Sequence, residues 1–327
     1  LRPDRFDEIL GMADNRTSKR LILMKQLFVF FLLLIFIMIS GCTDNIEKID
    51  LGIVEEPDIK ENDTSIKVAI ASVISPKESY IFYEDLIRYI SKKIGGNVKI
   101  VQRRSYSEVN ELIRNNEIDF AFVCSGAYVD GNSDFGMKLL AAPQMYGKTT
   151  YNSYIIVPIN SSYNNLTDLR GKKFAFTDPL SNSGTLYPTY RLSLMNETPG
   201  SFFGVDDKGK SKYFFTYSHD SSIIAVAEEL AEGAAVDSLV YIYLEKTKPE
   251  ITSKTRIIEI SPSFGIPPVV VSKDIDPFLE KRLRDILFEM DRDEEGKQIL
   301  SNIKIDGFVN IYDSDYDSIR KMKEYIK

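Results

Sequence analysis

The stretch that decides the fold is Thr177–Gly184, which reads TDPLSNSG. Apolar, strand-like residues 173–176 precede it, and a helical pattern at about 184–195 follows it. At such a junction the first backbone N–H groups of the helix are unpaired and carry the positive end of the helix dipole. Serine and asparagine side chains add neutral donors, so the junction predicts a cradle for an anion. Ordinary helix capping is the alternative interpretation.

Strand and helix patterns alternate on both sides of this junction. Upstream, strands are predicted at 66–72, 98–102 and 119–123, with helices at 76–94 and 106–115 and a turn at Ser125-Gly126. Downstream, strands are predicted at 213–217, 234–236, 256–260 and 267–271, with helices at 221–231, 240–246, 277–290 and 316–326. Such alternation is typical of α/β sheets. The sequence predicts two α/β lobes around a hinged cleft, one formed by residues 65–154 and 261–327 and the other by 155–260.

The N-terminal residues have the pattern of an export signal. Leu27–Ile39 is an apolar run that is too short to cross ~30 Å of hydrocarbon, and it leads into Ile39-Ser40-Gly41-Cys42, which resembles the bacterial lipobox. We expect translation to start at Met24, residues up to 41 to be removed, and Cys42 to be lipidated. Acidic residues 42–64 form a flexible tether on this interpretation. An uncleaved anchor helix is the alternative, and both place the body outside the cytoplasm, at the cell membrane.

The composition excludes several classes of function. A net charge of −7 over 327 residues argues against binding to nucleic acid or to anionic membrane surfaces. The single histidine excludes a His-Glu-x-x-His zinc helix, and no Gly-x-Ser-x-Gly elbow is present. With Cys42 lipidated, Cys124 has no disulfide partner, and its position after an apolar run predicts a buried packing residue. We expect no enzymatic activity, no metal and no cofactor.

Two literal motif matches fail in their context. Gly204–Ser211 fits the phosphate-loop pattern, but a strand-like run follows it where a helix is required, so a surface hairpin is predicted. Asp313, Asp315, Asp317 and Glu324 have the spacing of a calcium loop, yet Ser318 occupies the position of the turn glycine. The acidic run is instead expected to cap the last helix.

The segment Asp178–Tyr190 resembles the Asp-Pro-x-Ser-x-Ser-Gly-x-x-x-Pro-x-Tyr stretch of the phosphate/phosphite/phosphonate substrate-binding proteins of ABC transporters. Further stretches resemble the same family in the same order: Phe120–Tyr128, Ser218–Asp220, Ala225–Ala227, Ala235–Ser238 and Gly265–Val269. The resemblance covers residues 66–310. It implies the two-lobe type II periplasmic-binding fold.

The resemblance also implies a set of ligand-binding residues: Tyr106, Tyr151, Ser181, Asn182, Ser183 and His219. The serines and Asn182, which replaces a threonine of some relatives, are expected to hold the oxyanion. The two tyrosines match phenol donors of the family, and His219 matches its pocket histidine. From the residues alone, the tyrosines are instead interpreted as core aromatics, and the alternative role of His219 is to cap the following helix.

Three positions bear on which ligand is bound. Leu239 and Ile266 align with the glutamate and aspartate that recognise the ammonium of aminoalkylphosphonates in relatives, so an aminated ligand is disfavoured. Asp237 is a candidate pocket carboxylate, which would repel an anion unless the ligand offers a P–OH proton. We therefore expect a monomeric receptor that captures phosphonate, phosphite or phosphate for an ABC permease. The alternatives are a sensor for a membrane kinase, a sulfonate or sulfate binder, and an enzyme of the same fold with a lysine or cysteine nucleophile.

Overall fold

The computed structural model describes residues 65–71, 73 and 76–326, without the side chains of 76–82. The predicted signal peptide, Cys42 and the tether lie outside these residues. Thr64–Lys327 forms one compact unit. Among the described helices, none combines the length and apolar character needed to cross a bilayer.

The first sheet is formed by the early and late parts of the described chain. It has six strands in the order β13-β4-β12-β3-β1-β2. Its strands are β1 (Ile66–Ile70), β2 (Val98–Gln102), β3 (Phe120–Phe122), β4 (Lys138–Gln144), β12 (Val269–Val271) and β13 (Gly307–Val309). Strands β1, β2 and β3 are parallel, whereas β12 pairs antiparallel with both β3 and β4.

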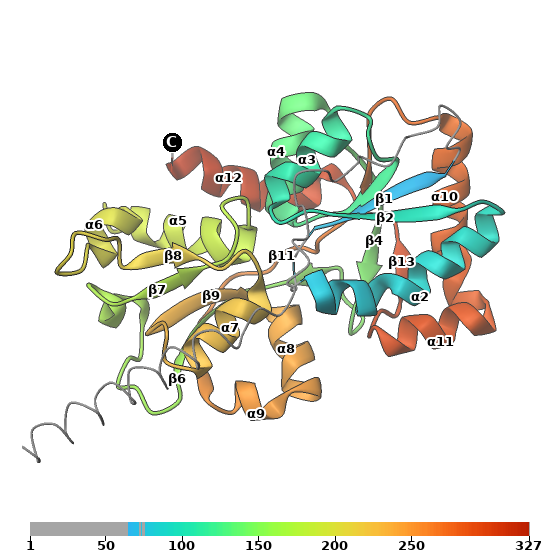
Figure 1. Cartoon of the computed structure of the whole chain (residues 1–327). Helices are drawn as coiled ribbons and strands as arrows, with labels where there is room; N and C mark the ends of the chain where they lie inside the picture. Colours follow the sequence, from blue (N-terminus) through green and yellow to red (C-terminus); the bar gives the residue numbers. More distant parts are fainter. Residues whose placement is uncertain (1–64, 72, 74–75, 327) are drawn as a thin grey trace, which may run out of the picture. The chain divides into compact units, whose positions relative to one another are not determined.

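The second sheet is formed by the middle of the chain and has five strands in the order β10-β6-β9-β7-β8. Its strands are β6 (Ser153–Pro158), β7 (Phe174–Phe176), β8 (Tyr213–Phe215), β9 (Gly233–Asp237) and β10 (Thr255–Ile260). Strands β7, β8 and β9 are parallel, and β6 is antiparallel to β9. The two sheets lie in separate lobes in Figure 1, and the predicted two-lobe α/β class is confirmed.

The chain crosses between the sheets twice, and the two crossings pair with each other. Strand β5 (Thr150–Tyr151) lies between β4 and β6, and β11 (Phe264–Gly265) lies between β10 and β12. They form a two-stranded antiparallel ribbon in which Tyr151 is opposite Phe264. A predicted site residue, Tyr151, is therefore part of the connection between the lobes.

Helices cover both faces of each sheet. Around the first sheet lie α2 (Pro76–Ile94), α3 (Tyr106–Arg114), α4 (Ser125–Phe135), α10 (Pro277–Glu289), η4 (Met290–Arg292) and α11 (Glu294–Asn302). Around the second sheet lie η2 (Leu166–Leu169), η3 (Asn182–Leu186), α5 (Tyr187–Ser193), α6 (Pro199–Phe203), α7 (His219–Ala227), α8 (Ser238–Thr247) and α9 (Pro249–Thr252). The chain ends in η5 (Asp313–Tyr316) and α12 (Asp317–Ile326). Helix α12 contacts α4 of one lobe and α5 of the other.

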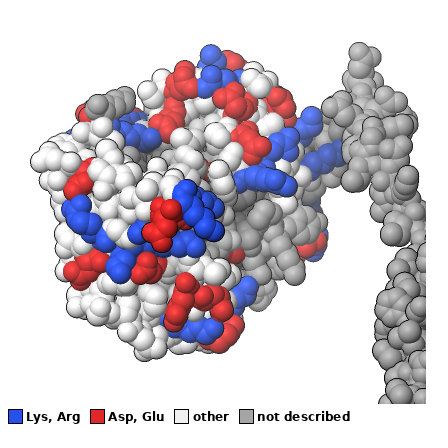
Figure 2. All heavy atoms as spheres, turned by 60° about the vertical axis from the view of Figure 1, so that its left-hand side comes forward, with Lys and Arg blue, Asp and Glu red and all other residues white. Residues whose placement is uncertain are grey.

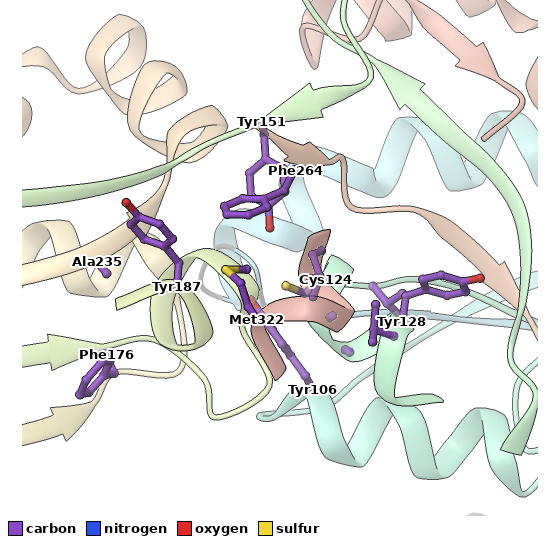
Figure 3. Packing of buried hydrophobic residues seen from close by; sticks show 14 of the residues in the cluster. Tyr106, Cys124, Tyr128, Tyr151, Phe176, Tyr187, Ala235, Phe264 and Met322 are labelled. Atoms are coloured by element: carbon purple, nitrogen blue, oxygen red, sulfur yellow. The ribbon is translucent and has the colours of Figure 1, made fainter. Parts of the chain in front are cut away.

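The period-two pattern of each strand divides its side chains between two cores. In β1, Val68 and Ile70 pack in the core under α2 and α10, whereas Ala69 belongs to the core that continues toward the second sheet. In β7, Phe174 and Phe176 face that shared core, and Ala175 faces the third core under α7 and α8. Figure 3 shows residues of the shared core, which contains both Tyr106 and Tyr151.

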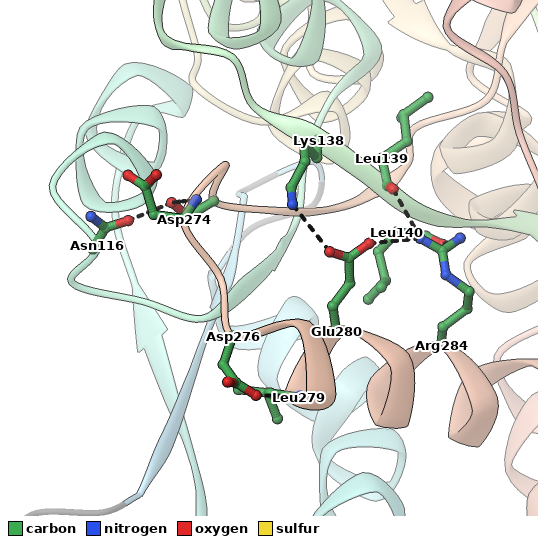
Figure 4. A network of polar contacts seen from close by, with 10 residues as sticks. Asn116, Lys138, Leu139, Leu140, Asp274, Asp276, Leu279, Glu280 and Arg284 are labelled. Carbon is green, nitrogen blue, oxygen red and sulfur yellow. Dashed lines mark hydrogen bonds and ion pairs between the residues drawn. The ribbon is translucent and has the colours of Figure 1, made fainter.

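A polar network fixes α10 to the first sheet. Glu280 accepts from Lys138 of β4 and from Arg284, which also donates to the carbonyl oxygen of Leu140 (Figure 4). Helix α10 begins with Asp276 as its cap, because the carboxylate accepts from the backbone N–H of Leu279 over 2.8 Å. The Lys138 and Leu140 contacts hold α10 against β4, the second strand of the first sheet.

Candidate functional site

The TDPLSNSG stretch follows β7 directly and leads into η3, which is a single π-helical turn. Ser181 caps this turn, because its Oγ accepts from the backbone N–H of Gly184 over 3.0 Å. Ser181, Asn182 and Ser183 are all fully buried. A Cβ on residue 184 would lie 1.7 Å from the Thr177 hydroxyl, so the turn requires glycine there. The capping interpretation therefore holds for Ser181. Because its Oγ acts as an acceptor in the cap, its hydroxyl hydrogen is left to donate to another group.

Several polar atoms around this turn are buried without a hydrogen-bond partner. Among the described residues they include Tyr106 Oη, Thr177 Oγ1, Asn182 Oδ1 and Ser183 Oγ. Leaving a buried polar group unpaired costs roughly 1–3 kcal/mol, so such groups are rare in folded proteins and a cluster of them indicates a site for a polar ligand. Thr177 was not among the predicted site residues, although its place as the first polar residue after β7 is a signal that sequence reasoning could have used.

Hydrogen bonds across the two lobes enclose the turn. Asn182 donates from Nδ2 to the Tyr151 hydroxyl over 3.0 Å, and the backbone N–H of Tyr106 donates to Asp178 Oδ2 over 3.0 Å. Tyr151 points toward Cys124 in Figure 3. Burial raises the pKa values of Tyr106 and Tyr151 well above their ordinary value, so both phenols remain donors at neutral pH.

The two lobes contact each other at Gly126. A Cβ on this residue would lie 2.3 Å from the carbonyl oxygen of Leu180 and 2.9 Å from the backbone nitrogen of Asn182. The predicted turn at Ser125 and Gly126 is wrong, because both belong to the first turn of α4. The absence of a side chain at Gly126 lets the N-terminal end of α4 contact the cradle directly.

His219 and Asp237 form a buried pair beside the cradle. His219 is the first residue of α7, and its Nδ1 accepts from the backbone N–H of Asp237 over 2.9 Å. Its Nε2 lies 3.5 Å from Ser181 Oγ. Burial lowers the His219 pKa to about 3, so the ring is neutral at pH 7 and Nε2 carries its hydrogen.

Asp237 is the cap of α8. Its Oδ1 accepts from the backbone N–H of Leu239 over 2.7 Å. Burial raises its pKa to about 7, against the lowering effect of these backbone hydrogen bonds. The side chain therefore changes its charge in the physiological pH range, beside the cradle.

The electrostatics of the site come from the backbone. Four helical elements begin at or beside the cradle, at residues Ser125, Asn182, His219 and Ser238. Within the described part of the chain, no Lys or Arg forms a hydrogen bond or ion pair with any of the seven predicted site residues. The groups that favour an anion at the cradle are thus the positive ends of the helices and neutral donors.

A cavity of about 100 Å³ adjoins the cradle, and Asp237 lines it. Its other lining residues come from both lobes and include Tyr83, Phe122, Leu239, Val240 and Ile266. The remaining six predicted site residues are buried and do not line this cavity. Sequence reasoning did not identify Tyr83 and Phe122, because only the folding of α2 and β3 brings them together.

Cys124 is a packing residue, as predicted. It is buried, and burial raises the pKa of its thiol to about 11, so it is protonated at pH 7 and a poor nucleophile. This argues against an enzyme that uses this cysteine. The two rejected motifs also have structural roles.

Gly204–Ser211 closes through a bridge between Val205 and Ser211, as a hairpin does. Asp313 accepts from the Tyr128 hydroxyl and pairs with Arg320. No group of three or more potential metal ligands occurs in the described residues. On the face drawn in Figure 2, acidic and basic side chains are interspersed, and that face carries no continuous basic surface.

Comparison with known proteins gives one family match. Residues 68–316 match the family model described as "ABC transporter, phosphonate, periplasmic substrate-binding protein". This range contains all seven predicted ligand-binding residues.

Two curated relatives align with the chain. A phosphate-import protein of Mycolicibacterium smegmatis is 32% identical over 164 residues, which are 48% of this chain and 50% of that protein. A phosphonates-binding periplasmic protein of Escherichia coli is 23% identical over 252 residues, which are 75% of this chain and 71% of that protein. The chain thus aligns with only half the length of the mycobacterial relative.

Solved structures share the fold. The binding-protein component of a phosphonate ABC transporter from Pseudomonas aeruginosa superposes with a TM-score of 0.73 at 23% identity, covering 80% of this chain and 86% of that one. A Prochlorococcus marinus protein in complex with methylphosphonate superposes with a TM-score of 0.72 at 20% identity, covering 80% and 98%. The predicted two-lobe periplasmic-binding fold is confirmed by these likenesses.

Proposed function

The chain belongs to the family of periplasmic substrate-binding proteins of phosphonate ABC transporters, and from this we propose that it captures a small phosphorus oxyanion between its two lobes for delivery to a permease. The lobes proposed are residues 65–154 with 261–327, and residues 155–260. The protein is a non-enzymatic binding component. The ligand class proposed is phosphonate, phosphite or phosphate.

The observation that carries this proposal is the pair of buried, unpartnered hydroxyl groups of Tyr106 and Ser183. One comes from each lobe, and each has a hydrogen to donate. With Tyr151, Ser181 and the Nε2–H of His219, they make a set of neutral donors suited to the oxygens of a tetrahedral anion. A ligand held by both lobes stabilises their closed arrangement, which is the state that a permease can recognise.

Asp237 supports a ligand that carries a proton. A carboxylate beside an anion is repulsive unless a proton lies between them. The unpartnered Asn182 Oδ1 is likewise an acceptor. Both fit a P–OH group, which monoanionic phosphite, phosphate and phosphonates have and which sulfate lacks at neutral pH.

The proposal is tested by calorimetric titration of the purified protein, unfolded and refolded to remove carried-over ligand. We expect phosphite, methylphosphonate or phosphate to bind with a Kd of micromolar or tighter, about −8 kcal/mol or better, and sulfate to bind far more weakly. Ser183→Ala is expected to weaken binding at least tenfold. Ser193→Ala is the matched control, because its hydroxyl donates to the carbonyl oxygen of Tyr190 away from the cradle. Failure of every phosphorus ligand with a folded protein would overturn the assignment.

We also propose that Cys42 is lipidated and anchors the protein at the outer face of the cell membrane. The support is the Ile39-Ser40-Gly41-Cys42 sequence after an apolar run. Metabolic labelling with a fatty-acid analogue in a bacterial host is expected to label the protein and to fail for Cys42→Ser. Cys124→Ser is the control that retains the label, and its loss of label instead would contradict the proposal.

A further inference from the structure

The apolar cavity beside the cradle is positioned to receive a second part of the same ligand. Asp237 connects the cavity to the cradle. It lines the cavity, and its backbone N–H donates to His219, whose other ring nitrogen faces Ser181 of the cradle. A tetrahedral phosphorus group held by the cradle therefore has one face toward Asp237 and the cavity. A substituent on phosphorus would extend from that face.

The cavity lining is apolar on both sides. One lobe contributes Tyr83, Phe122, Ile266 and Pro268, and the other contributes Leu239 and Val240. Its charged lining residues are Asp237 and the exposed Lys304. One oxygen of the Asp237 carboxylate, Oδ1, accepts from the backbone N–H of Leu239. Such a lining gains free energy from a hydrocarbon group, whereas an ammonium group would lose its hydration there with Asp237 as its one acidic partner among the lining residues.

Given the proposed oxyanion site, we infer that this cavity binds the organic substituent of the ligand, and that the preferred ligands are phosphonates with an uncharged hydrocarbon group longer than methyl. A volume of about 100 Å³ exceeds several-fold the ~10–15 Å³ that one water needs, so the cavity has room for such a group. Phosphite and phosphate fill the cradle alone. They leave the contribution of the apolar lining unused.

A ligand series on the unmodified protein tests this inference. The series is phosphite, methyl-, ethyl-, propyl- and butylphosphonate and 2-aminoethylphosphonate, measured by calorimetry at one pH. Each buried methylene is expected to improve the Kd about three- to fourfold, at least as far as propyl. The 2-aminoethyl compound is expected to bind more weakly than propylphosphonate, which has a similar length. Equal or falling affinity beyond methyl would overturn the inference while leaving the oxyanion site intact, whereas no binding by any member would overturn the proposed function itself.

A paired substitution tests the lining. Leu239 is half-buried, so Leu239→Gln is tolerable in the fold and puts a polar group into the cavity. We expect it to reduce the ratio of propylphosphonate to phosphite affinity at least fivefold, with phosphite binding as the internal measure of an intact cradle. Leu230→Gln, at an exposed leucine outside the cavity, is the matched control and is expected to leave the ratio unchanged. An unchanged ratio in Leu239→Gln would overturn the inference.

Discussion

The backbone N–H of Asp237 donates to Nδ1 of His219 across 2.9 Å, and this bond decides which ring nitrogen carries the hydrogen. Because Nδ1 accepts, the neutral ring is protonated at Nε2, the atom 3.5 Å from Ser181 Oγ. The end of β9 thus orients the first residue of α7 as a neutral donor. The bond also couples the histidine to the only described site carboxylate that lines the cavity.

The first prediction concerns stability against pH in His219→Asn, which keeps an acceptor for the Asp237 N–H. The folded pKa of His219, about 3, is below its ordinary 6.5, so its contribution to the free energy of unfolding is complete above about pH 6.5 and is lost as the pH falls toward 3. As the pH is lowered from 6 to 4, the free energy of unfolding of the parent should therefore fall relative to that of the variant. The expected slope is up to about 1.4 kcal/mol per pH unit.

Urea unfolding followed by circular dichroism measures this difference. Asp237 has the opposite trend, because its folded pKa of about 7 exceeds its ordinary 3.8 and stability is lost as the pH rises toward 7, but that trend is common to both proteins. His219 is the only histidine of the chain, so no other imidazole contributes. A constant difference from pH 7 to 4 would mean that the ring protonates as readily in the folded protein as in the unfolded one.

The second prediction concerns Tyr106→Phe, which removes a buried hydroxyl without a partner. The ligand-free variant should be as stable as the parent or more stable, because an unsatisfied polar group is removed. Its affinity for methylphosphonate should fall roughly ten- to hundredfold, the usual value of a hydrogen bond to a charged group.

Tyr241→Phe is the matched control for this substitution. The Tyr241 hydroxyl is paired with Thr255 Oγ1 at 2.9 Å, away from the cradle, so its removal should lower stability by about 1 kcal/mol and leave affinity unchanged. Thermal unfolding and calorimetry on both variants give the two readouts. Tyr106→Phe with unaltered affinity would remove Tyr106 from the site.

Strong periodicity made part of the fold predictable. The helix Pro76–Ile94 and the strand Val98–Gln102 have the bounds expected from their apolar patterns. Helix α4 was missed, because Gly126 and Gly131 are poor helix formers and the helix depends on packing against the cradle and Met137. Strand β13 was missed because its three residues give no period. Neither element has a local sequence pattern from which it could be predicted.

The site was predictable where its residues follow one another. Ser181–Ser183 were found from their junction between β7 and a helix, whereas Tyr106, Tyr151 and His219 depended on family resemblance. Ser153, whose buried hydroxyl donates to the carbonyl oxygen of Ser183 over 2.6 Å, was not found, since one serine after Tyr151 has no signature. The cavity was also not found, because it exists only where the two lobes meet.

The third prediction concerns Gly126→Ala. Its Cβ would lie 2.3 Å from the carbonyl oxygen of Leu180, so the two lobes could not keep their present contact. Affinity for methylphosphonate should fall at least tenfold, since the ligand would have to bridge a wider gap. Gly200→Ala in α6, where the added Cβ meets its nearest atom at 3.7 Å, should bind normally. If both variants bind alike in calorimetry, contact at Gly126 is not required for binding.

The fourth prediction concerns the proton at Asp237. As the pH rises through about 7, this carboxyl group ionises beside the proposed anion, so affinity should fall in the parent but not for this reason in Asp237→Asn. Asparagine retains an oxygen to accept from the Leu239 N–H, so α8 keeps its cap. Measured with methylphosphonate from pH 6 to 8.5, the ratio of parent to variant Kd should rise with pH.

Asp276→Asn is the matched control, because Asp276 caps α10 through the same kind of bond, to the Leu279 N–H, on an exposed helix end. The ratio of the parent Kd to the Asp276→Asn Kd should be independent of pH. A flat ratio for Asp237→Asn would place the carboxyl group out of electrostatic contact with the ligand, and selection against sulfate would then need another cause. A rising ratio for Asp237→Asn alone would identify Asp237 as the group that requires a proton in the complex.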